Sequence, residues 1–272
     1  MTTTHILEIP GVRLRYEVRG TGPLLLLLGA PMAAAYFAPL ADALAGDHTV
    51  LTHDPRGIAG SVLDDPAQDS TPELRADDAA ALMDALGVES ADVLGSSGGA
   101  VTGLALAARL PKRVRTLVAH EPPCLELLPD AAERRAATED IIETYHREGV
   151  GPAFAKFMAS AGFDGDEVPD GAPDGAPEEP SEQDLADSAR FFAHELRGTT
   201  RYVPDVDALK AGPARVVVGI GADSGRLLTY RTSVALAGLL GTEPVVFPGE
   251  HVGFTDQPEE FARTLREVLA AS

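Results

Sequence analysis

The stretch Val93-Leu94-Gly95-Ser96-Ser97-Gly98-Gly99 decides the fold, because it joins an apolar run to a segment of helical character. The apolar run is typical of a buried strand, and residues 100–110 are typical of a helix. Ser97 then lies on a sharp turn, which Gly95 and Gly99 permit because neither has a side chain to collide with its neighbours. The Gly-x-Ser-x-Gly pattern in this context predicts a nucleophilic serine exposed above a sheet, whereas a simple glycine- and serine-rich loop would lack the flanking strand and helix.

Strands and helices alternate on both sides of this turn. Residues 7–9 and 12–18 alternate apolar with polar side chains across Pro10-Gly11, which predicts an antiparallel hairpin. Buried strands are expected at residues 24–28, 49–53, 91–94, 114–119, 214–220 and 244–247, and helices at residues 35–45, 72–86 and 100–110. Such alternation with short connections predicts an α/β fold with a mostly parallel, doubly wound sheet.

The alternation stops between residues 122 and 204. Three helix-like segments follow there, at residues 131–149, 152–161 and 182–196. We interpret residues 1–121 and 205–272 as the core, and residues 122–204 as a helical cap inserted over the carboxyl ends of the strands. Within the insertion, residues 164–183 are rich in Asp, Glu, Pro and Gly without one Lys or Arg, so a mobile acidic loop is expected there; a solvated insertion is favoured over a substrate gate.

Composition limits the classes of partner. The 272 residues include 22 Lys+Arg and 42 Asp+Glu, and the net charge of −20 would repel nucleic acid and anionic membranes. One cysteine, Cys124, excludes an internal disulfide, and residues 1–5 lack the pattern of a secretion signal, which favours a cytoplasmic location. We expect a small-molecule substrate, with no metal or other cofactor, and leave open whether the chain forms a homodimer.

A serine nucleophile needs a base, and His251 is the best placed of seven histidines. It follows the last expected strand and precedes the last helix, and Gly249 and Gly253 flank it. The carboxyl end of a parallel strand is where open α/β sheets place their sites. His251 is therefore the expected general base for Ser97.

Four features together make the chain resemble the α/β-hydrolase fold family, in its esterase, haloperoxidase-like and haloalkane-dehalogenase-like branch. Gly29-Ala30-Pro31 resembles the family's His-Gly-x-Pro segment, Asp54-Pro55-Arg56-Gly57 its Asp-x-Arg-Gly turn, Gly95 to Gly99 its nucleophile elbow, and His251 its late histidine. The resemblance covers essentially the whole chain. Two positions depart from it: Leu28 replaces the expected histidine, and Ala59 replaces the second glycine of the turn.

By this resemblance, the backbone N–H groups of Ala30 and Gly98 would form the oxyanion hole. The acid of the triad has two candidates. Glu121 ends the strand before the insertion, and Asp223 lies one residue before the place where most of the family carries its acid, which Ser224 occupies here. A carboxylate near the base is required, and Glu121 is the favoured choice.

Side chains close to the oxyanion segment and the elbow are expected to contact the substrate: Pro31, Met32, Tyr36 and Ser96. The leading hypothesis is a serine hydrolase that cleaves a small, largely apolar carboxylic ester or lactone. Thioester hydrolysis and cofactor-free perhydrolysis are alternatives within the enzyme class, and a non-hydrolytic small-molecule-binding or receptor-like protein is the alternative outside it.

Overall fold

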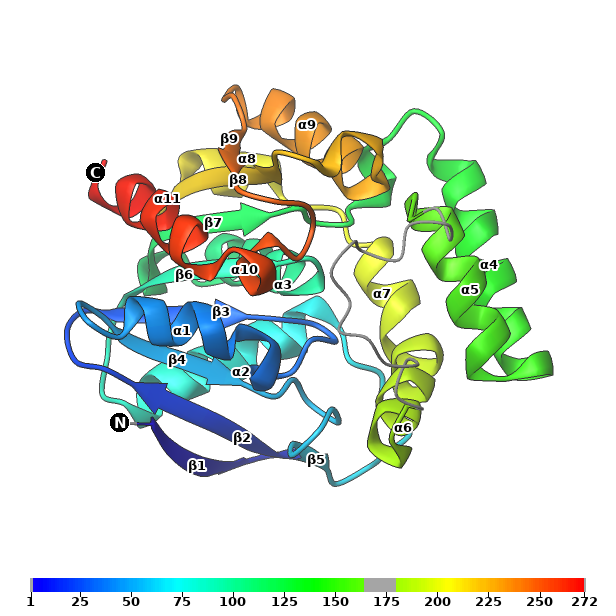
Figure 1. Cartoon of the computed structure of the whole chain (residues 1–272), viewed down its shortest axis with the longest axis horizontal. Helices are drawn as coiled ribbons and strands as arrows, with labels where there is room; N and C mark the ends of the chain where they lie inside the picture. The colour runs from blue at the N-terminus through cyan, green and yellow to red at the C-terminus, as the bar shows by residue number, and fades with distance from the viewer. Residues whose placement is uncertain (1, 164–179, 272) are drawn as a thin grey trace, which may run out of the picture.

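The computed structural model describes residues 2–163 and 180–271, which form a twisted sheet between two layers of helices (Figure 1). The nine strands of this described part have the order β1-β2-β4-β3-β6-β7-β8-β9, with β5 paired to β2. Their bounds are β1 Thr2–Ile9, β2 Val12–Arg19, β3 Leu24–Leu28, β4 Thr49–His53, β5 Val62–Leu63, β6 Ala91–Ser96, β7 Val114–His120, β8 Arg215–Gly221 and β9 Val245–Phe247.

The pairing confirms a mostly parallel α/β sheet. Strands β3, β4, β6, β7, β8 and β9 run parallel to their neighbours in this group, as in the register Leu25↔Asp92 between β3 and β6. The predicted hairpin is present, with β1 antiparallel to β2 and Ile9 opposite Val12. The short strand β5 was not expected, because two residues are too few to show an alternating pattern.

Helices cover both faces of the sheet and alternate with the strands, except between β7 and β8, where α4 to α8 follow one another. Their bounds are α1 Ala38–Leu44, α2 Pro72–Ala85, α3 Gly98–Arg109, α4 Ala131–Glu148, α5 Val150–Ala161, α6 Glu182–Arg190, α7 Leu196–Thr200, α8 Val206–Ala211, α9 Leu228–Leu240, α10 Gly253–Asp256 and α11 Pro258–Ala270. Thr71 accepts a hydrogen bond from the Leu74 N–H at 3.3 Å and so caps α2, with Pro72 in its first turn, as the sequence indicates.

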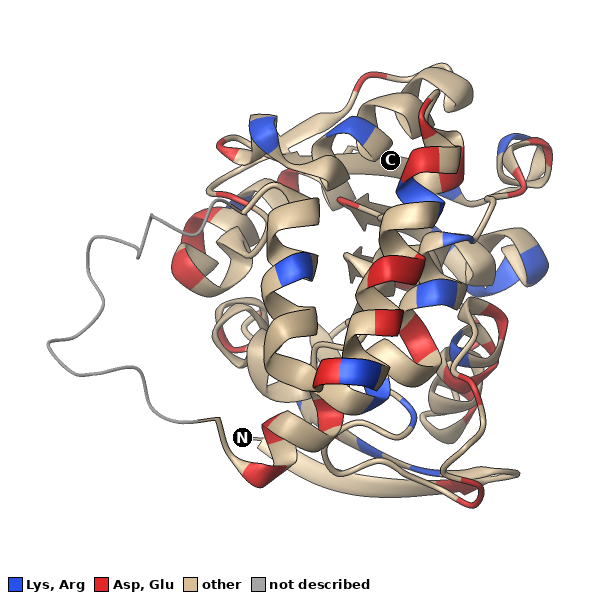
Figure 2. Ribbon diagram, turned by 90° about the vertical axis from the view of Figure 1, so that its right-hand side faces the viewer, with Lys and Arg blue, Asp and Glu red and all other residues tan. Residues whose placement is uncertain are grey.

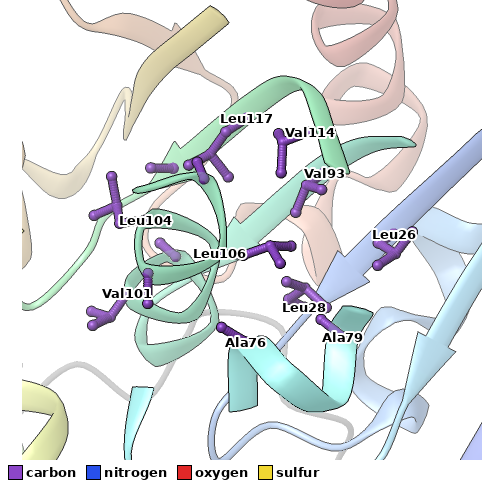
Figure 3. Close-up of a cluster of buried hydrophobic side chains, with 14 of the residues drawn as sticks. Leu26, Leu28, Ala76, Ala79, Val93, Val101, Leu104, Leu106, Val114 and Leu117 are labelled. Atoms are coloured by element: carbon purple, nitrogen blue, oxygen red, sulfur yellow. The ribbon is translucent and has the colours of Figure 1, made fainter. Parts of the chain in front are cut away.

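The leucines of β3 divide the core between the two helix layers. Leu26 and Leu28 point into the cluster with α2 and α3, which Figure 3 shows around Val93, whereas Leu25 and Leu27 join the cluster with α1 and α11. All four are fully buried. Side chains alternate across a strand, so an uninterrupted run of leucines supplies both faces of a covered sheet at about 1.5–3 kcal/mol for each buried side chain.

Helices α4 to α7 lie between β7 and β8 in the chain, at one end of the sheet (Figure 1). The third predicted segment here, residues 182–196, contains a π-helical turn at Phe191–Glu195 between α6 and α7. Most of the predicted acidic loop, residues 164–179, lies outside the described residues, and Glu182 and Gln183 at its end already belong to α6, which Ser181 caps. The division into core and cap stays a prediction. None of the helices in the described ranges is long and apolar enough to cross a membrane.

Candidate active site

Ser97 occupies a strained turn between β6 and α3. Its backbone angles are φ 56° and ψ −125°, a conformation that a side chain normally disfavours. A Cβ atom on Gly95 would collide with the carbonyl of Gly99, and one on Gly99 would collide with the carbonyl of Leu28. The two glycines are therefore required for the close approach of strand and helix, and Ser97 remains partly exposed at the end of the sheet.

The two predicted oxyanion donors lie side by side. A Cβ atom on Gly98 would lie 3.1 Å from the Cβ atom of Ala30 and would collide with its carbonyl oxygen. Gly98 begins α3, where the first N–H groups of a helix lack partners within the helix. The neighbouring segment is held by Asp54, whose Oδ1 accepts the Ala34 N–H at 2.9 Å. The Ala30 and Gly98 segments therefore lie next to each other beside Ser97, and their role as an oxyanion hole stays a prediction.

His251 is paired with Glu121. Its Nδ1 lies 2.6 Å from Oε2 of Glu121, and the two side chains are 12% and 0% exposed. Glu121 directly follows β7, while His251 lies on the loop between β9 and α10, so the sheet brings together residues that are 130 positions apart. A short hydrogen bond of this kind fixes the orientation of the imidazole ring. The second ring nitrogen, Nε2, then points away from Glu121.

The Glu121 carboxylate accepts three hydrogen bonds. Besides the His251 ring, the Gly221 N–H donates to Oε1 at 2.8 Å and the Thr229 hydroxyl donates to Oε2 at 2.9 Å. Burial alone raises the pKa of Glu121, but the hydrogen bond from His251 and the neighbouring charges of His120 and His251 outweigh burial and lower this pKa to about 2. Glu121 is therefore ionised at neutral pH. Its backbone has a φ of 51°, a further strained position at this end of the sheet.

Asp223 does not contact His251. It is exposed, and its N–H donates to the Gly249 carbonyl at 3.0 Å, while its carboxylate makes no hydrogen bond or ion pair within the described ranges. Of the two acids considered from the sequence, Glu121 is the one that pairs with His251. The physical reason is that Asp223 is exposed, two residues beyond β8, whereas Glu121 is buried directly after β7 and lies 2.6 Å from the His251 ring.

His120 links the serine turn to the His251 loop. Its carbonyl accepts the Ser97 N–H at 2.9 Å, and its ring stacks on the ring of His251 with centroids 6.5 Å apart. Full burial lowers the pKa of His120 to about 4, despite the opposing charge of Glu121, so this ring is neutral above that pH. No hydrogen bond joins Ser97 Oγ to His251 among the described residues, and such bonds are often long before a substrate binds.

The residues expected to contact a substrate differ in their accessibility. Pro31 and Met32 are partly buried beside the oxyanion segment, and Pro31 follows a cis peptide bond. Tyr36 is 55% exposed. Ser96 is fully buried, and its hydroxyl pairs with Nδ1 of His120 at 3.3 Å, so the expectation for Ser96 has to be corrected: this side chain has no surface open to a substrate.

Comparison with known proteins agrees with this fold. Residues 22–160 match the family model described as the alpha/beta hydrolase fold. The uncharacterized hydrolase YraK of Bacillus subtilis is 34% identical over 270 residues, which cover 97% of this chain and 94% of that protein. This chain belongs to the α/β-hydrolase family.

Solved structures of this α/β-hydrolase fold superpose along the whole chain. A thermophilic esterase from Thermogutta terrifontis has a TM-score of 0.74 at 21% identity, with 99% of this chain and 98% of that chain covered. The enol-lactonase from Burkholderia xenovorans LB400 has a TM-score of 0.65 at 19% identity, with 98% and 100% covered. At these identities the likeness concerns the fold.

The two departures from the α/β-hydrolase pattern have structural explanations. Leu28 is fully buried in the apolar cluster of α2 and α3, and Asp54 anchors the segment that follows it. Ala59 takes a left-handed φ of 48°, and its N–H donates to the Asp187 carboxylate of the insertion at 3.1 and 3.2 Å. That contact offsets part of the conformational cost of a residue with a side chain at this position.

Two residues near His251 were missed by sequence reasoning. Thr229 lies in the first turn of α9, and the ring of Phe163, at the end of α5, stands edge-on to His251 with centroids 6.2 Å apart. Neither belongs to a motif, and nothing in the local pattern distinguishes a first-turn threonine or a single phenylalanine from its neighbours.

Proposed function

We propose that this protein is a serine hydrolase that cleaves a small, largely apolar carboxylic ester or lactone through an acyl-enzyme. The observation that carries the proposal is the 2.6 Å contact between His251 Nδ1 and Glu121 Oε2, at the edge of the sheet where the Ser97 turn lies. Nucleophile, base and acid with these roles are the requirement for activating a serine hydroxyl.

In the first half of the reaction, Ser97 Oγ attacks the substrate carbonyl carbon while His251 Nε2 takes the hydroxyl proton. The Ala30 and Gly98 N–H groups stabilise the oxyanion. The intermediate then expels the alkoxide, which receives the proton from His251 and leaves as an alcohol. For a lactone, that alcohol stays attached to the acyl group.

In the second half, His251 takes a proton from water, and the resulting hydroxide attacks the acyl carbon. Collapse of the intermediate releases the carboxylic acid and returns the proton to Ser97. Glu121 remains a carboxylate throughout, because its pKa is about 2, and it stabilises the imidazolium that forms twice in each cycle.

Apolar surroundings support the choice of substrate class. The Phe163 ring faces His251, and Val252 packs against the core beside it. Figure 2 shows the side of the molecule formed by the insertion. Charged residues lie along α4, whereas Lys156 is the single charged residue of α5. We propose that residues 122–204 cap the site and present apolar side chains to the substrate; the esterase and lactonase of the same fold fit this class.

A labelling and turnover experiment tests the proposal. A fluorophosphonate probe should label Ser97, and p-nitrophenyl butyrate should be hydrolysed; the Ser97→Ala variant should lose labelling and about 10³–10⁴-fold or more of kcat. Absence of both labelling and turnover in the wild-type protein would overturn the proposal and favour a non-hydrolytic binding protein. Turnover that survives in Ser97→Ala would show that another group is the nucleophile.

A further inference from the structure

Thr229 touches both members of the His251 and Glu121 pair. Its hydroxyl oxygen lies 2.9 Å from Oε2 of Glu121 and 3.5 Å from Nδ1 of His251. The hydroxyl has one proton, and Nδ1 already donates its own proton to the carboxylate, so the Thr229 proton goes to Glu121. Oε2 therefore accepts from two donors, while Oε1 accepts from the Gly221 N–H.

Helix α9 also holds the backbone next to Glu121. The hydroxyl of Thr232, one turn further along α9, donates to the Pro122 carbonyl at 2.6 Å and is fully buried. The carbonyl of Thr229 itself accepts a hydrogen bond from the Ser233 hydroxyl at 2.7 Å, and the Thr232 hydroxyl oxygen lies 2.9 Å from the same carbonyl. The first turn of α9 is thus fixed to the residue that follows the acid, and it offers one hydroxyl to the carboxylate.

We propose that Thr229 is a positioning residue of the active site, which fixes the plane of the Glu121 carboxylate against His251 and moderates its negative charge. This inference rests on the proposed function, since it assumes that His251 acts as the base. The contacts of the two carboxylate oxygens give the role a reason, because the Gly221 N–H holds Oε1 while Thr229 and His251 hold Oε2, and together they fix one orientation of the group.

Loss of this hydroxyl should change the electrostatics as well as the geometry. Without the second donor, the negative charge of Oε2 is less offset, so the imidazolium form of His251 gains stabilisation. The carboxylate also gains rotational freedom, which weakens the orientation of the ring. Among the described residues, the titratable groups that contact the His251 ring are Glu121 and His120. Because His120 is neutral above a pH of about 4, the loss of the Thr229 hydroxyl affects His251 through Glu121.

The test compares Thr229→Val, which has the same shape without the hydroxyl, with Thr229→Ser, which retains it. Thr229→Val should lower kcat by about tenfold with little change in KM, and the acid limb of its kcat/KM profile should move to higher pH. Thr229→Ser should recover most of the rate and the original acid limb. Thr144→Val is the matched control, because this buried threonine of α4 donates to the Asp140 carbonyl of its own helix, and its profile should equal that of the wild type.

Three results would overturn the inference. They are an unchanged rate and profile in Thr229→Val, a loss of rate with an unmoved acid limb, and failure of Thr229→Ser to recover either quantity. An unchanged rate and profile would show that Thr229 has no role in the reaction. Either of the other two results would show that Thr229 acts only through packing. If Thr229→Val does not fold, Thr229→Ala takes its place with the same expected loss and shift. Ser97→Ala is measured in parallel, so that failure of the proposed function is recognised separately.

Discussion

The two helix layers and the α6 part of the insertion are held in place by different chemistry. The layers pack through buried aliphatic and aromatic side chains, as at Phe37 and Phe254, whose rings stack with centroids 4.8 Å apart. The α6 and π-turn part of the insertion instead contacts the core through charged and polar groups, whereas Leu125 and Leu128, near the start of the insertion, pack on α9 through apolar contacts. Apolar packing tolerates many similar sequences, whereas polar contacts need particular partners at particular distances.

We call Asp187, Arg190 and His194 the latch. The Arg190 guanidinium donates to the carbonyls of Pro66 and Gln68 at 3.0 and 2.8 Å, and it fills the space that a side chain on Gly57 would occupy. Asp187 accepts the Ala59 N–H, and His194 Nδ1 lies 2.9 Å from Asp69 Oδ1. The latch therefore fastens the insertion to the loop whose Asp54 holds the oxyanion segment.

The contrast extends to two buried carboxylates. Glu121, in the core, has three hydrogen-bond donors and a pKa of about 2. Glu195, in the insertion, has no hydrogen bond to either oxygen among the described residues, and Arg190 stands 3.9 Å away. Burial raises the pKa of Glu195, although Arg75 and Arg190 act in the opposite direction. The same type of side chain is thus held charged in one region and driven toward its neutral form in the other.

The largest expected effect separates the two acids considered from the sequence. Glu121→Gln should lower kcat by about 10³–10⁴-fold, because the imidazolium loses its counter-charge and its orientation. Asp223→Asn is the control and should keep the rate within about twofold, since its carboxylate contacts nothing in the site. Hydrolysis of p-nitrophenyl butyrate measures both. A large loss in Asp223→Asn with a small loss in Glu121→Gln would reverse the assignment.

The next effect concerns a charged pair inside the core. Asp78 binds the Arg56 guanidinium with both oxygens, at 2.6 and 2.8 Å, and both side chains are nearly inaccessible. Asp78→Ala should lower the free energy of unfolding by about 3–5 kcal/mol, because a buried cation loses its partner. Asp77→Ala removes an exposed pair with Arg109 and should cost about 0–1 kcal/mol. Urea denaturation measures the difference, and equal losses in the two variants would contradict it.

Breaking the latch should have a smaller effect on stability, confined to α6. Arg190→Met keeps the length of the side chain but removes its hydrogen bonds to the loop, so local opening of α6 should become easier by about 2 kcal/mol. Hydrogen exchange of α6 amides measures this. Arg147→Met, which alters an exposed residue at the end of α4, is the control and should leave α6 exchange unchanged. Faster exchange throughout the sheet in Arg190→Met would show that the insertion and core open as one unit.

The smallest effect tests the contrast between the carboxylates. A raised pKa means that ionisation of Glu195 opposes folding as the pH rises above the unfolded value near 4.5. Glu195→Gln should therefore raise the free energy of unfolding by about 1 kcal/mol at pH 8 and leave it almost unchanged at pH 4. Thermal unfolding at both pH values measures the change. A destabilised variant at pH 8 would show that Arg75 and Arg190 require the charge.

Much of the fold could be predicted because its signals are local. Strand β4 occupies the residues expected for it, and α2 begins at the expected Pro72 with its Thr71 cap. The leucine run of β3 needs no distant partner to be recognised as a covered strand. The family could be predicted on the same basis, since the serine turn, the Asp54 turn and the late His251 are short motifs, and the family model over residues 22–160 confirmed it.

The sequence by itself therefore determined the layers of this protein and the serine on which the proposed site is built, because both are encoded in short-range patterns. Only the tertiary structure paired His251 with Glu121 and not with Asp223, turned Ser96 toward His120, and placed Thr229 beside Glu121. These choices depend on where three separate strands end and how the loops beyond them bend. Contacts between residues about 100 to 130 positions apart carry no signature in the local sequence. The partners of each site residue are therefore defined only when the sheet is complete.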